Sequence, residues 1–442
     1  MFTRESWQRR GDAWLIYLYA QPRGPILGDA LRHRRCRLPN SASYNRGLFR
    51  SRHAKCFVTF SGKPATALPG ARIDGVDLLR GLAIFFVLMN HVNIRLLLAR
   101  IPYTAGLPRQ LIGSLVWNGQ NGVQIFFAAS GFLITSTALR RWGKLSQVSL
   151  RGFYLTRFAR IAPLLMLLLA VLTALHFGRF QDFIVSARTG GISRALLAAL
   201  TFHLNVLEAR HGYLPGNWDI LWSLSVEEMF YLFFPIVSRL FARGKLLVLL
   251  LATFVALGPF ARTFLAGGNE LWKQYSYLGG MDAIALGCLT ALAVERFPLS
   301  PRTLRGLAVA GSALLIFILC FAAQPANLAL ERAGLDMTIL ALAACMLIAA
   351  ASQSDWKSPG ILRPLARLGQ RSYEVYLAHM FVVFAFFHLF LFAGKPMVAV
   401  PLLFLAVIVV SALFGEIVAR FYSEPLNRLI RARGRDAWPS RH

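Results

Sequence analysis

Long apolar blocks divide this sequence, and they limit its possible folds more than any other feature. Blocks of about 17–25 residues, at 161–177, 245–265 and 398–419 for example, match the roughly 30 Å hydrocarbon core of a bilayer at about 1.5 Å per helical residue. Lipid offers no partner to unpaired backbone groups, so several such blocks in one chain predict an all-α bundle that spans a membrane. A soluble protein with an unusually large core is the alternative interpretation.

Composition and charge favour the membrane interpretation. The 442 residues are 56% apolar and 15% charged, whereas about 25% is usual for a soluble domain. The formal net charge of +28 would favour nucleic-acid binding in a soluble protein. Here, however, the Lys and Arg residues lie in short loops between apolar blocks, as in loops retained in the cytoplasm. We therefore expect a lipid bilayer, and no nucleic acid, as a partner.

The five cysteines form no recognisable framework. Cys288, Cys320 and Cys345 lie within apolar blocks, where a thiol behaves as a small hydrophobic group. Cys36 and Cys56 lie near the amino terminus, and no Cys-x-x-Cys or Cys/His spacing is present. We expect neither disulfides nor a metal site.

Loop charges indicate the topology. The linker 140–160 holds six Lys/Arg residues and no acid, so we place it in the cytoplasm together with the amino terminus. The stretch 194–207 is too short to cross the membrane unaided. Treating it as a re-entrant or interfacial segment also places the later basic clusters and the carboxyl terminus inside. This leaves ten predicted spans, at 76–98, 119–139, 161–177, 221–238, 245–265, 276–294, 304–323, 335–352, 372–393 and 398–420.

The two ends of the chain differ from the apolar centre. Residues 1–70 carry 13 Lys/Arg against three acids and hold no apolar run long enough to span, which predicts a disordered cytoplasmic tail or an over-extended translation start. Residues 71–425 form the predicted transmembrane domain, and 426–442 a basic cytoplasmic tail. We expect an integral protein of a bacterial inner (plasma) membrane, and the loop charges place both termini in the cytoplasm.

Ionisable residues inside a membrane are costly, so each one in an apolar block is a candidate for function. Arg80 and His91 lie eleven positions apart in the first block, about 20° from the same helical face and about 16 Å apart along the helix axis. This places a cation near the cytoplasmic edge and an imidazole near the middle of the bilayer. A helix-end arginine that extends to the interface and a buried, hydrogen-bonded histidine are the simpler explanations.

Two further pairs carry like charges. Arg157 and Arg160 share a face of the segment that enters the third span, where guanidinium groups suit the phosphates of a cytosolic donor. Lipid headgroups and plain topology signalling are alternatives. Glu227 and Glu228 lie at the start of the span 221–238, and the topology places them toward the outer side, opposite the two arginines.

Several neighbouring polar residues complete the candidate set. Trp222 and Ser223 precede the two glutamates, and a tryptophan at a membrane boundary is common without any function. Ser130 lies beside Gly131, where small residues favour close helix packing. Tyr376 and His379 lie three positions apart in the span 372–393 and could share a face. Asp282 and Glu374 are further intramembrane acids.

Taken in order, these residues resemble acyltransferase family 3, the integral membrane carbohydrate O-acyltransferases. The resemblance runs from Ile73 to Pro425. Gln124 stands where an Asp is usual, and Ile-Ala-Pro163 where Ile-Tyr-Pro is commoner. The five motifs are the Arg80–His91 spacing, the largely apolar pattern from Gly-Val to Ser-Gly-Phe-Leu-Ile at 122–134, the pair Arg157 and Arg160, Trp-Ser-Leu-Ser-Val-Glu at 222–227, and Leu-Gly-x-x-Ser-Tyr-x-x-Tyr-Leu-x-His at 368–379.

The resemblance implies a function and residue roles. The donor would be cytosolic acyl-CoA, most often acetyl-CoA, and the acceptor a glycan at or beyond the outer face. Arg157 and Arg160 would hold the phosphates of coenzyme A with help from Arg80. His91 would be the general base or a transient acyl carrier, and Glu227 would orient the acceptor from the outer side. His379 is a second candidate base.

The same resemblance leaves alternatives. Many family members carry a carboxyl-terminal extracytoplasmic hydrolase-like domain, whereas this chain ends soon after its last apolar block, so we expect a standalone membrane domain. Succinyl or other acyl transfer to a periplasmic glucan, a lipid or a small molecule is a second candidate. A proton-coupled transporter would also bury Arg, His and Glu in a bundle, but no internal repeat supports it. No residue pattern indicates a particular sugar or oligomeric state.

Overall fold

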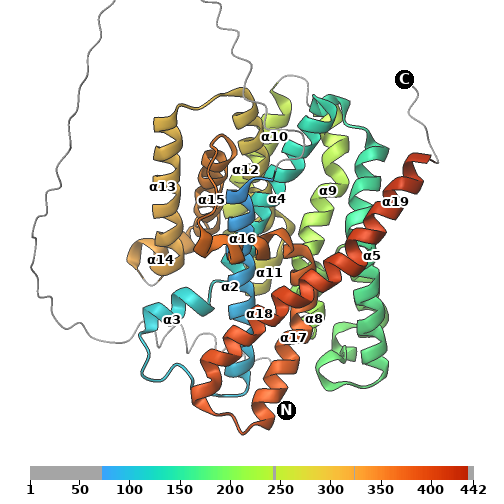
Figure 1. Cartoon of the computed structure of the whole chain (residues 1–442), viewed down its shortest axis with the longest axis vertical. Coiled ribbons are helices and arrows are strands. Elements are labelled where there is room, and N and C mark those ends of the chain that lie inside the picture. The colour runs from blue at the N-terminus through green and yellow to red at the C-terminus, as the bar shows by residue number, and fades with distance from the viewer. Residues whose placement is uncertain (1–71, 242–244, 323, 437–442) are drawn as a thin grey trace, which may run out of the picture. The chain divides into compact units, whose positions relative to one another are not determined.

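The computed structural model describes residues 72–241, 245–322 and 324–436, and over those residues it contains helices and no strand (Figure 1). The predicted tail 1–70, with Cys36 and Cys56, lies outside the described residues. The ten long helices are α2 (Asp74–Leu98), α4 (Gly119–Trp142), α5 (Leu150–Phe177), α9 (Leu221–Phe241), α10 (Leu246–Phe260), α12 (Tyr277–Arg296), α13 (Pro301–Cys320), α15 (Asp336–Ser352), α17 (Ser372–Phe392) and α18 (Val400–Val418).

Short helices connect and cover the long ones. Two π-helical turns, Ala261–Leu265 and Ala419–Ser423, continue α10 and α18. The short helices are α3 (Arg109–Val116), α6 (Gly191–Leu200), α7 (Leu204–His211), α8 (Gly216–Asp219), α11 (Glu270–Tyr275), α14 (Pro325–Arg332), α16 (Arg363–Gln370) and α19 (Glu424–Asp436).

The predicted membrane bundle is confirmed. Among the described residues, nine helices are long and apolar enough to cross a bilayer, or up to eleven if two bent pairs each count as a span. One bent pair joins Gln181–Thr189 to α6 at 95°, which is the geometry of a broken span or a re-entrant loop, and it contains the first half of the stretch 194–207 that we expected to be re-entrant. The other joins α14 to α15 at 106°.

One predicted boundary is wrong in a way that moves candidate residues. The third long helix begins at Leu150 and not near residue 161, because the Ser149 side chain caps it by accepting the Gly152 N–H. An apolar block marks only the part of a helix that faces lipid, and charged residues continue a helix without difficulty. Most of the expected linker 140–160 is therefore helical, and Arg157 and Arg160 lie inside α5.

Helices α5 and α9 run antiparallel, and their contacts fix the level of each residue. Tyr154 donates a hydrogen bond to the Leu232 carbonyl, and the rings of Phe153 and Phe234 stack at 5.8 Å. At the same end of the bundle, α2 and α17 begin, and Arg80 donates to Ser372. We call this end, at which α2, α5 and α17 begin and α4 and α9 finish, the basic end.

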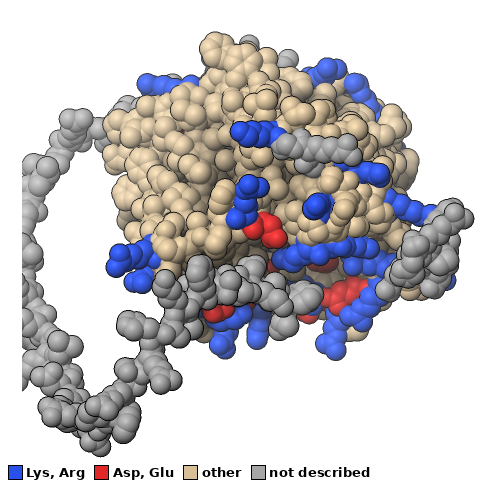
Figure 2. All heavy atoms as spheres, turned by 90° about the horizontal axis from the view of Figure 1, so that it is seen from above, with Lys and Arg blue, Asp and Glu red and all other residues tan. Residues whose placement is uncertain are grey.

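The basic end carries an excess of positive charge. Figure 2, which looks down on the top of Figure 1, shows many Lys and Arg side chains around this face and few acidic ones. Exposed cations here include Arg141, Lys144, Arg151, Arg239 and Lys245. This distribution is the three-dimensional form of the loop-charge pattern on which the predicted topology depends.

Glycines let the central helices touch backbone to backbone. A Cβ on Gly131 would lie 2.0 Å from the Ile284 carbonyl oxygen, and one on Gly287 would lie 2.1 Å from that of Ala128, so α4 and α12 are in direct contact. Helix α16 lies across α2 with equally close contacts at Gly81 and Gly369 (Figure 1). Small residues at helix interfaces allow this approach in membranes. The packing explanation for Gly131 is therefore confirmed.

Candidate active site

His91 lies on α2 with its two ring nitrogens in different surroundings. Nδ1 is 2.8 Å from the carbonyl oxygen of Val87, one turn earlier on the same helix. A carbonyl oxygen can only accept, so Nδ1 carries the proton and Nε2 carries the lone pair. The side chain is partly exposed. His91 therefore offers an unprotonated Nε2, which is the form that a general base requires.

His379 of α17 lies directly beside His91. The two imidazole centroids are 5.0 Å apart with an angle of 64° between the ring planes. The Nδ1 atom of His379 is 2.6 Å from the Tyr376 carbonyl oxygen, so this ring has the same tautomer as His91. His379 is fully buried, and its Nε2 has no hydrogen-bond partner among the described atoms. The two predicted candidate bases thus form a pair.

Arg80 is held at the start of the bundle by α17. Its Nη2 donates to Ser372 Oγ at 2.6 Å, and the charges of Arg160, Asp77 and Glu227 lie close enough to act on it. Arg80 is therefore partly buried against a second helix and is not a helix-end side chain that simply extends to the interface. The spacing of eleven residues places it roughly 16 Å along α2 from His91, toward the basic end.

Tyr231 joins the predicted arginine and glutamate motifs. Its phenol hydrogen-bonds to Glu227 Oε1 one turn earlier on α9, and the Arg157 guanidinium lies over its ring, 4.1 Å from the centroid. A cation over an aromatic face is attracted by the ring quadrupole. Ser130 of α4 adjoins the same phenol. Residues from α4, α5 and α9 therefore meet around one buried tyrosine.

The expected placement of the glutamates on the outer side, opposite the arginines, is wrong. Glu227 hydrogen-bonds to Tyr231, the ring on which Arg157 stacks, so the arginines and Glu227 share one level of the bundle. The error follows from the start of α5, because an α5 that begins at Leu150 carries its arginines about 10–15 Å into the bundle.

The two remaining members of these motifs differ in burial. Glu228 is buried, and its Oε1 lacks a partner among the described atoms, whereas Arg160 is exposed.

Tyr376 connects α17 to the start of α9. Its hydroxyl is 2.6 Å from Ser223 Oγ and 2.9 Å from the Ile220 carbonyl oxygen, and its ring lies 5.8 Å from that of His379. Trp222 stacks on Tyr275 at 4.1 Å and is 5% exposed, so it faces other side chains and not the membrane boundary. All eleven predicted site residues therefore lie along α2, α4, α5, α9 and α17.

Comparison with known proteins identifies a family for this chain. The acyltransferase domain family matches residues 73–416, which include every one of the predicted site residues. The chain belongs to this acyltransferase family. No solved structure matches the chain.

Relatives of the acyltransferase are named for acetyl transfer. The peptidoglycan O-acetyltransferase OatA of Listeria monocytogenes is 26% identical over 384 residues, which are 80% of this chain and 56% of the relative. The O-acetyltransferase OatA of Staphylococcus aureus is 23% identical over 369 residues, 80% of this chain and 57% of the relative. The chain thus spans somewhat more than half the length of these relatives.

The acyltransferase has a second cluster of charged groups, at the end of the bundle opposite the basic end. Glu208 of α7 is fully buried, and its Oε1 accepts the Leu214 N–H. Burial, together with the nearby charge of Asp219, raises the pKa of Glu208 well above its usual range. Asp219 accepts a hydrogen bond from Tyr275. Sequence reasoning missed Glu208 because it directly follows the apolar stretch 194–207, and an acid outside the apolar blocks gives no signal.

A buried ion pair lies away from the histidines. Asp282 of α12 accepts from Arg262 at 2.8 Å, from Thr338 at 2.6 Å and from Gln124 at 3.0 Å. Arg262 also donates to two main-chain carbonyls, so the pair is fully hydrogen-bonded and connects α10, α12, α15 and α4. Asp282 therefore has a packing role here. The sequence signal that could have identified its partner, Arg262, was a single Arg in the apolar block 245–265.

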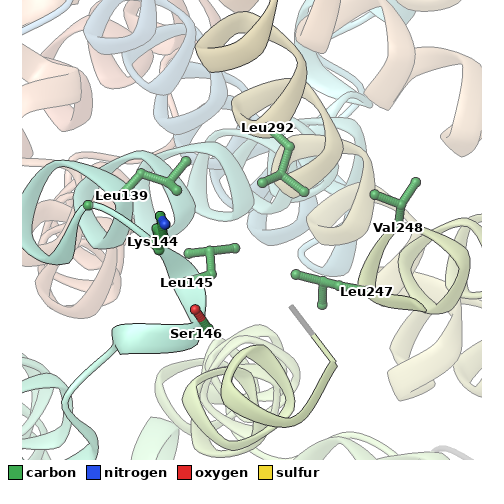
Figure 3. A pocket seen from close by; sticks show the side chains of 8 residues that line it. Leu139, Lys144, Leu145, Ser146, Leu247, Val248 and Leu292 are labelled. Carbon is green, nitrogen blue, oxygen red and sulfur yellow. The ribbon is translucent and has the colours of Figure 1, made fainter. Parts of the chain in front are cut away.

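A pocket of about 260 Å³ opens near the basic end but belongs to a different region. It lies between the end of α4, the turn Leu145–Gln147, the start of α10 and α12 (Figure 3). Its lining is mainly apolar, and Lys144 and Ser146 are its polar members. None of the candidate site residues contributes to it. Among the described residues, no group of three His, Cys, Asp or Glu side chains could hold a metal ion.

Proposed function

We propose that the protein transfers an acyl group, usually acetyl, from cytosolic acyl-CoA to a hydroxyl of an exported or cell-surface carbohydrate. The observation that carries this proposal is the lone pair on His91 Nε2, which the hydrogen bond from Nδ1 to the Val87 carbonyl leaves free to accept a proton. The acetyltransferase names of the OatA relatives support the choice of acyl group and of a carbohydrate acceptor.

The reaction requires one proton to move. As the acceptor oxygen attacks the thioester carbonyl, the hydroxyl O–H bond breaks and His91 Nε2 takes the proton. The new C–O bond forms and the C–S bond breaks, and the coenzyme A thiolate then takes up a proton, so that the products are an ester and a thiol. A positioned base of this kind contributes about 10²–10⁴-fold to a rate.

The arginines and Glu227 would position the donor. Arg160 is exposed and lies within the electrostatic range of Arg80, so this pair offers two cations to the phosphates of coenzyme A. Arg157 stacks on Tyr231, so its role would be to hold Tyr231 and Glu227. In this proposal Glu227 orients the reacting groups at the level of the arginines and not from the outer face.

The experiment compares purified wild-type protein with His91→Ala in bilayer nanodiscs. Acetyl-CoA is the donor and a chito-oligosaccharide is the acceptor, and both coenzyme A release and the mass of the sugar are measured. We expect the wild type to release coenzyme A and add the mass of one acetyl group, and the variant to lose at least about 100-fold in rate. His388→Gln, which changes an exposed histidine of α17 outside the candidate site, is the control and should remain active.

Two results would contradict the proposal. Undiminished turnover in His91→Ala would remove His91 as the base or the acyl carrier. Wild-type protein that consumes none of a set of acyl-CoA donors, acetyl and succinyl included, would contradict acyl transfer itself. A succinyl mass on the sugar would keep the reaction class and change the donor.

A further inference from the structure

Neither histidine in the candidate site has the partner that a catalytic imidazole usually has. An imidazole that acts as a base becomes positively charged, and a carboxylate at Nδ1 commonly stabilises that charge. Here Nδ1 of His91 donates to the Val87 carbonyl, and Nδ1 of His379 donates to the Tyr376 carbonyl. Among the described groups, the charges that act on these two rings are those of Arg95 and the other histidine, the Tyr376 ring lies 5.8 Å from that of His379, and no carboxylate is among these neighbours.

The Nε2 atom of His379 is buried without a hydrogen-bond partner among the described residues, which is energetically unfavourable. This atom has a free lone pair and no donor nearby in the described part of the chain. A buried polar atom without a partner destabilises the folded state, so its presence calls for an explanation. The nearest titratable ring is His91, at 5.0 Å between centroids.

The burial of Nε2 also limits what His379 can bind. Solvent does not reach this atom, so a substrate that reaches His91 has no open path to it. A proton passed from a neighbouring ring needs no such path. The geometry therefore favours a role for His379 that acts through His91.

We propose that His379 is a proton-holding residue that works with His91 in the transfer reaction. This inference rests on the proposed function. The acceptor hydroxyl gives its proton to His91 Nε2, and, once the two Nε2 atoms come within hydrogen-bond distance, His379 Nε2 takes that proton while His91 returns to its neutral form. When the C–S bond has broken, the proton returns through His91 to the thiolate sulfur. The two rings hold one proton between them, and no oxidant, metal or further reactant is needed.

Two substitutions separate this role from a structural one. In His379→Asn, the side-chain amide can replace the Nδ1–H donor to the Tyr376 carbonyl but offers no group at the position of Nε2. In His379→Gln, the amide oxygen reaches about as far as Nε2 and can accept a hydrogen bond, but it cannot hold a proton at neutral pH. We expect both variants to lose about 100-fold or more in kcat with the KM for acetyl-CoA unchanged.

The measurement is coenzyme A release in nanodiscs with acetyl-CoA and a chito-oligosaccharide, together with the melting temperature of each variant. Full activity in His379→Asn would mean that the only role of His379 is its hydrogen bond to the Tyr376 carbonyl. Full activity in His379→Gln would reduce it to a hydrogen-bond acceptor, and either result overturns the proposal. If wild-type protein releases no coenzyme A, the proposed function fails first. A loss of kcat with an unchanged melting temperature in both variants supports the inference.

Discussion

Two main-chain carbonyls set the tautomers of the two histidines. Val87 lies four residues before His91, and Tyr376 lies three before His379, so each ring is held by its own helix. From the contact of Arg80 with Ser372, α2 and α17 continue to the two rings, whose centroids are 5.0 Å apart and which have the same tautomer. The proposed base is therefore oriented by backbone geometry, and no carboxylate is among the groups that act on it in the described part of the chain.

The hydrogen bond between Tyr231 and Glu227 gives the first prediction at this scale. Tyr231→Phe keeps the ring under the Arg157 guanidinium but removes the donor to Glu227. A hydrogen bond to a charged group contributes about 1.5–3 kcal/mol, so we expect kcat/KM for acetyl-CoA to fall about 10–100-fold. Coenzyme A release measures the change.

Tyr154→Phe is the matched control for Tyr231→Phe. It removes a hydrogen bond between the same two helices, from Tyr154 to the Leu232 carbonyl, that does not involve Glu227. We expect its activity to equal that of the wild type. Equal losses in the two variants would mean that α5–α9 packing, and not the orientation of Glu227, explains the effect.

The sequence predicted some of these residues and not their partners. The spacing of Arg80 and His91 was enough to place them on one face, because both lie on one helix. The pairing of His91 with His379, and that of Arg157 with Tyr231, depends on how separate helices pack. Residues 288 positions apart leave no local periodic signal, so only the fold could show that the two candidate bases are neighbours.

At the scale of helices, the apolar blocks located the spans and missed their ends. Lipid-facing residues such as Leu167 and Val171 mark the apolar part of α5, whereas Arg157 and Arg160 continue the same helix toward the basic end. The block therefore predicted the existence of α5 but not the level of its arginines. That single difference also explains the wrong expectation for Glu227.

The contact between α4 and α12 gives a prediction at this scale. In Gly287→Ala, the added Cβ would lie 2.1 Å from the Ala128 carbonyl oxygen, so the two helices must separate. Forcing extra volume into a packed interface costs about 1–3 kcal/mol. We expect a lower melting temperature in detergent and a loss of activity, since α4 also carries Ser130 beside Tyr231.

Gly306→Ala on α13 is the comparison for Gly287→Ala. A Cβ at Gly306 would meet no atom within 4 Å, and replacing a helical glycine by alanine gains about 0.5–1 kcal/mol. We expect it to melt at the wild-type temperature or slightly higher. If Gly287→Ala melts no lower than Gly306→Ala, the close approach of α4 and α12 has no part in stability.

Over the whole molecule, the candidate residues form a path along the bundle. Arg80, Arg157 and Arg160 lie toward the basic end, the histidine pair lies further along α2 and α17, and the cluster of Glu208 and Asp219 lies toward the opposite end. In the proposed reaction, a donor from one side and an acceptor from the other meet at the histidines. The direction of that transfer depends on which end faces the cytoplasm.

Cysteine labelling tests this direction. With the five native cysteines replaced, single cysteines are introduced at Ala105 and Ala393, which follow α2 and α17, and at Ser354, which follows α15. Ala351 packs against Gly75 near the start of α2, so Ser354 lies at the basic end. Because Lys and Arg are retained in the cytoplasm, we expect a membrane-impermeant maleimide to label residues 105 and 393 in intact cells. Residue 354 should be labelled only after the membrane is opened. Labelling of residue 354 alone in intact cells would place the arginines outside, where they could not receive a cytosolic acyl-CoA, and would overturn the proposed direction of transfer.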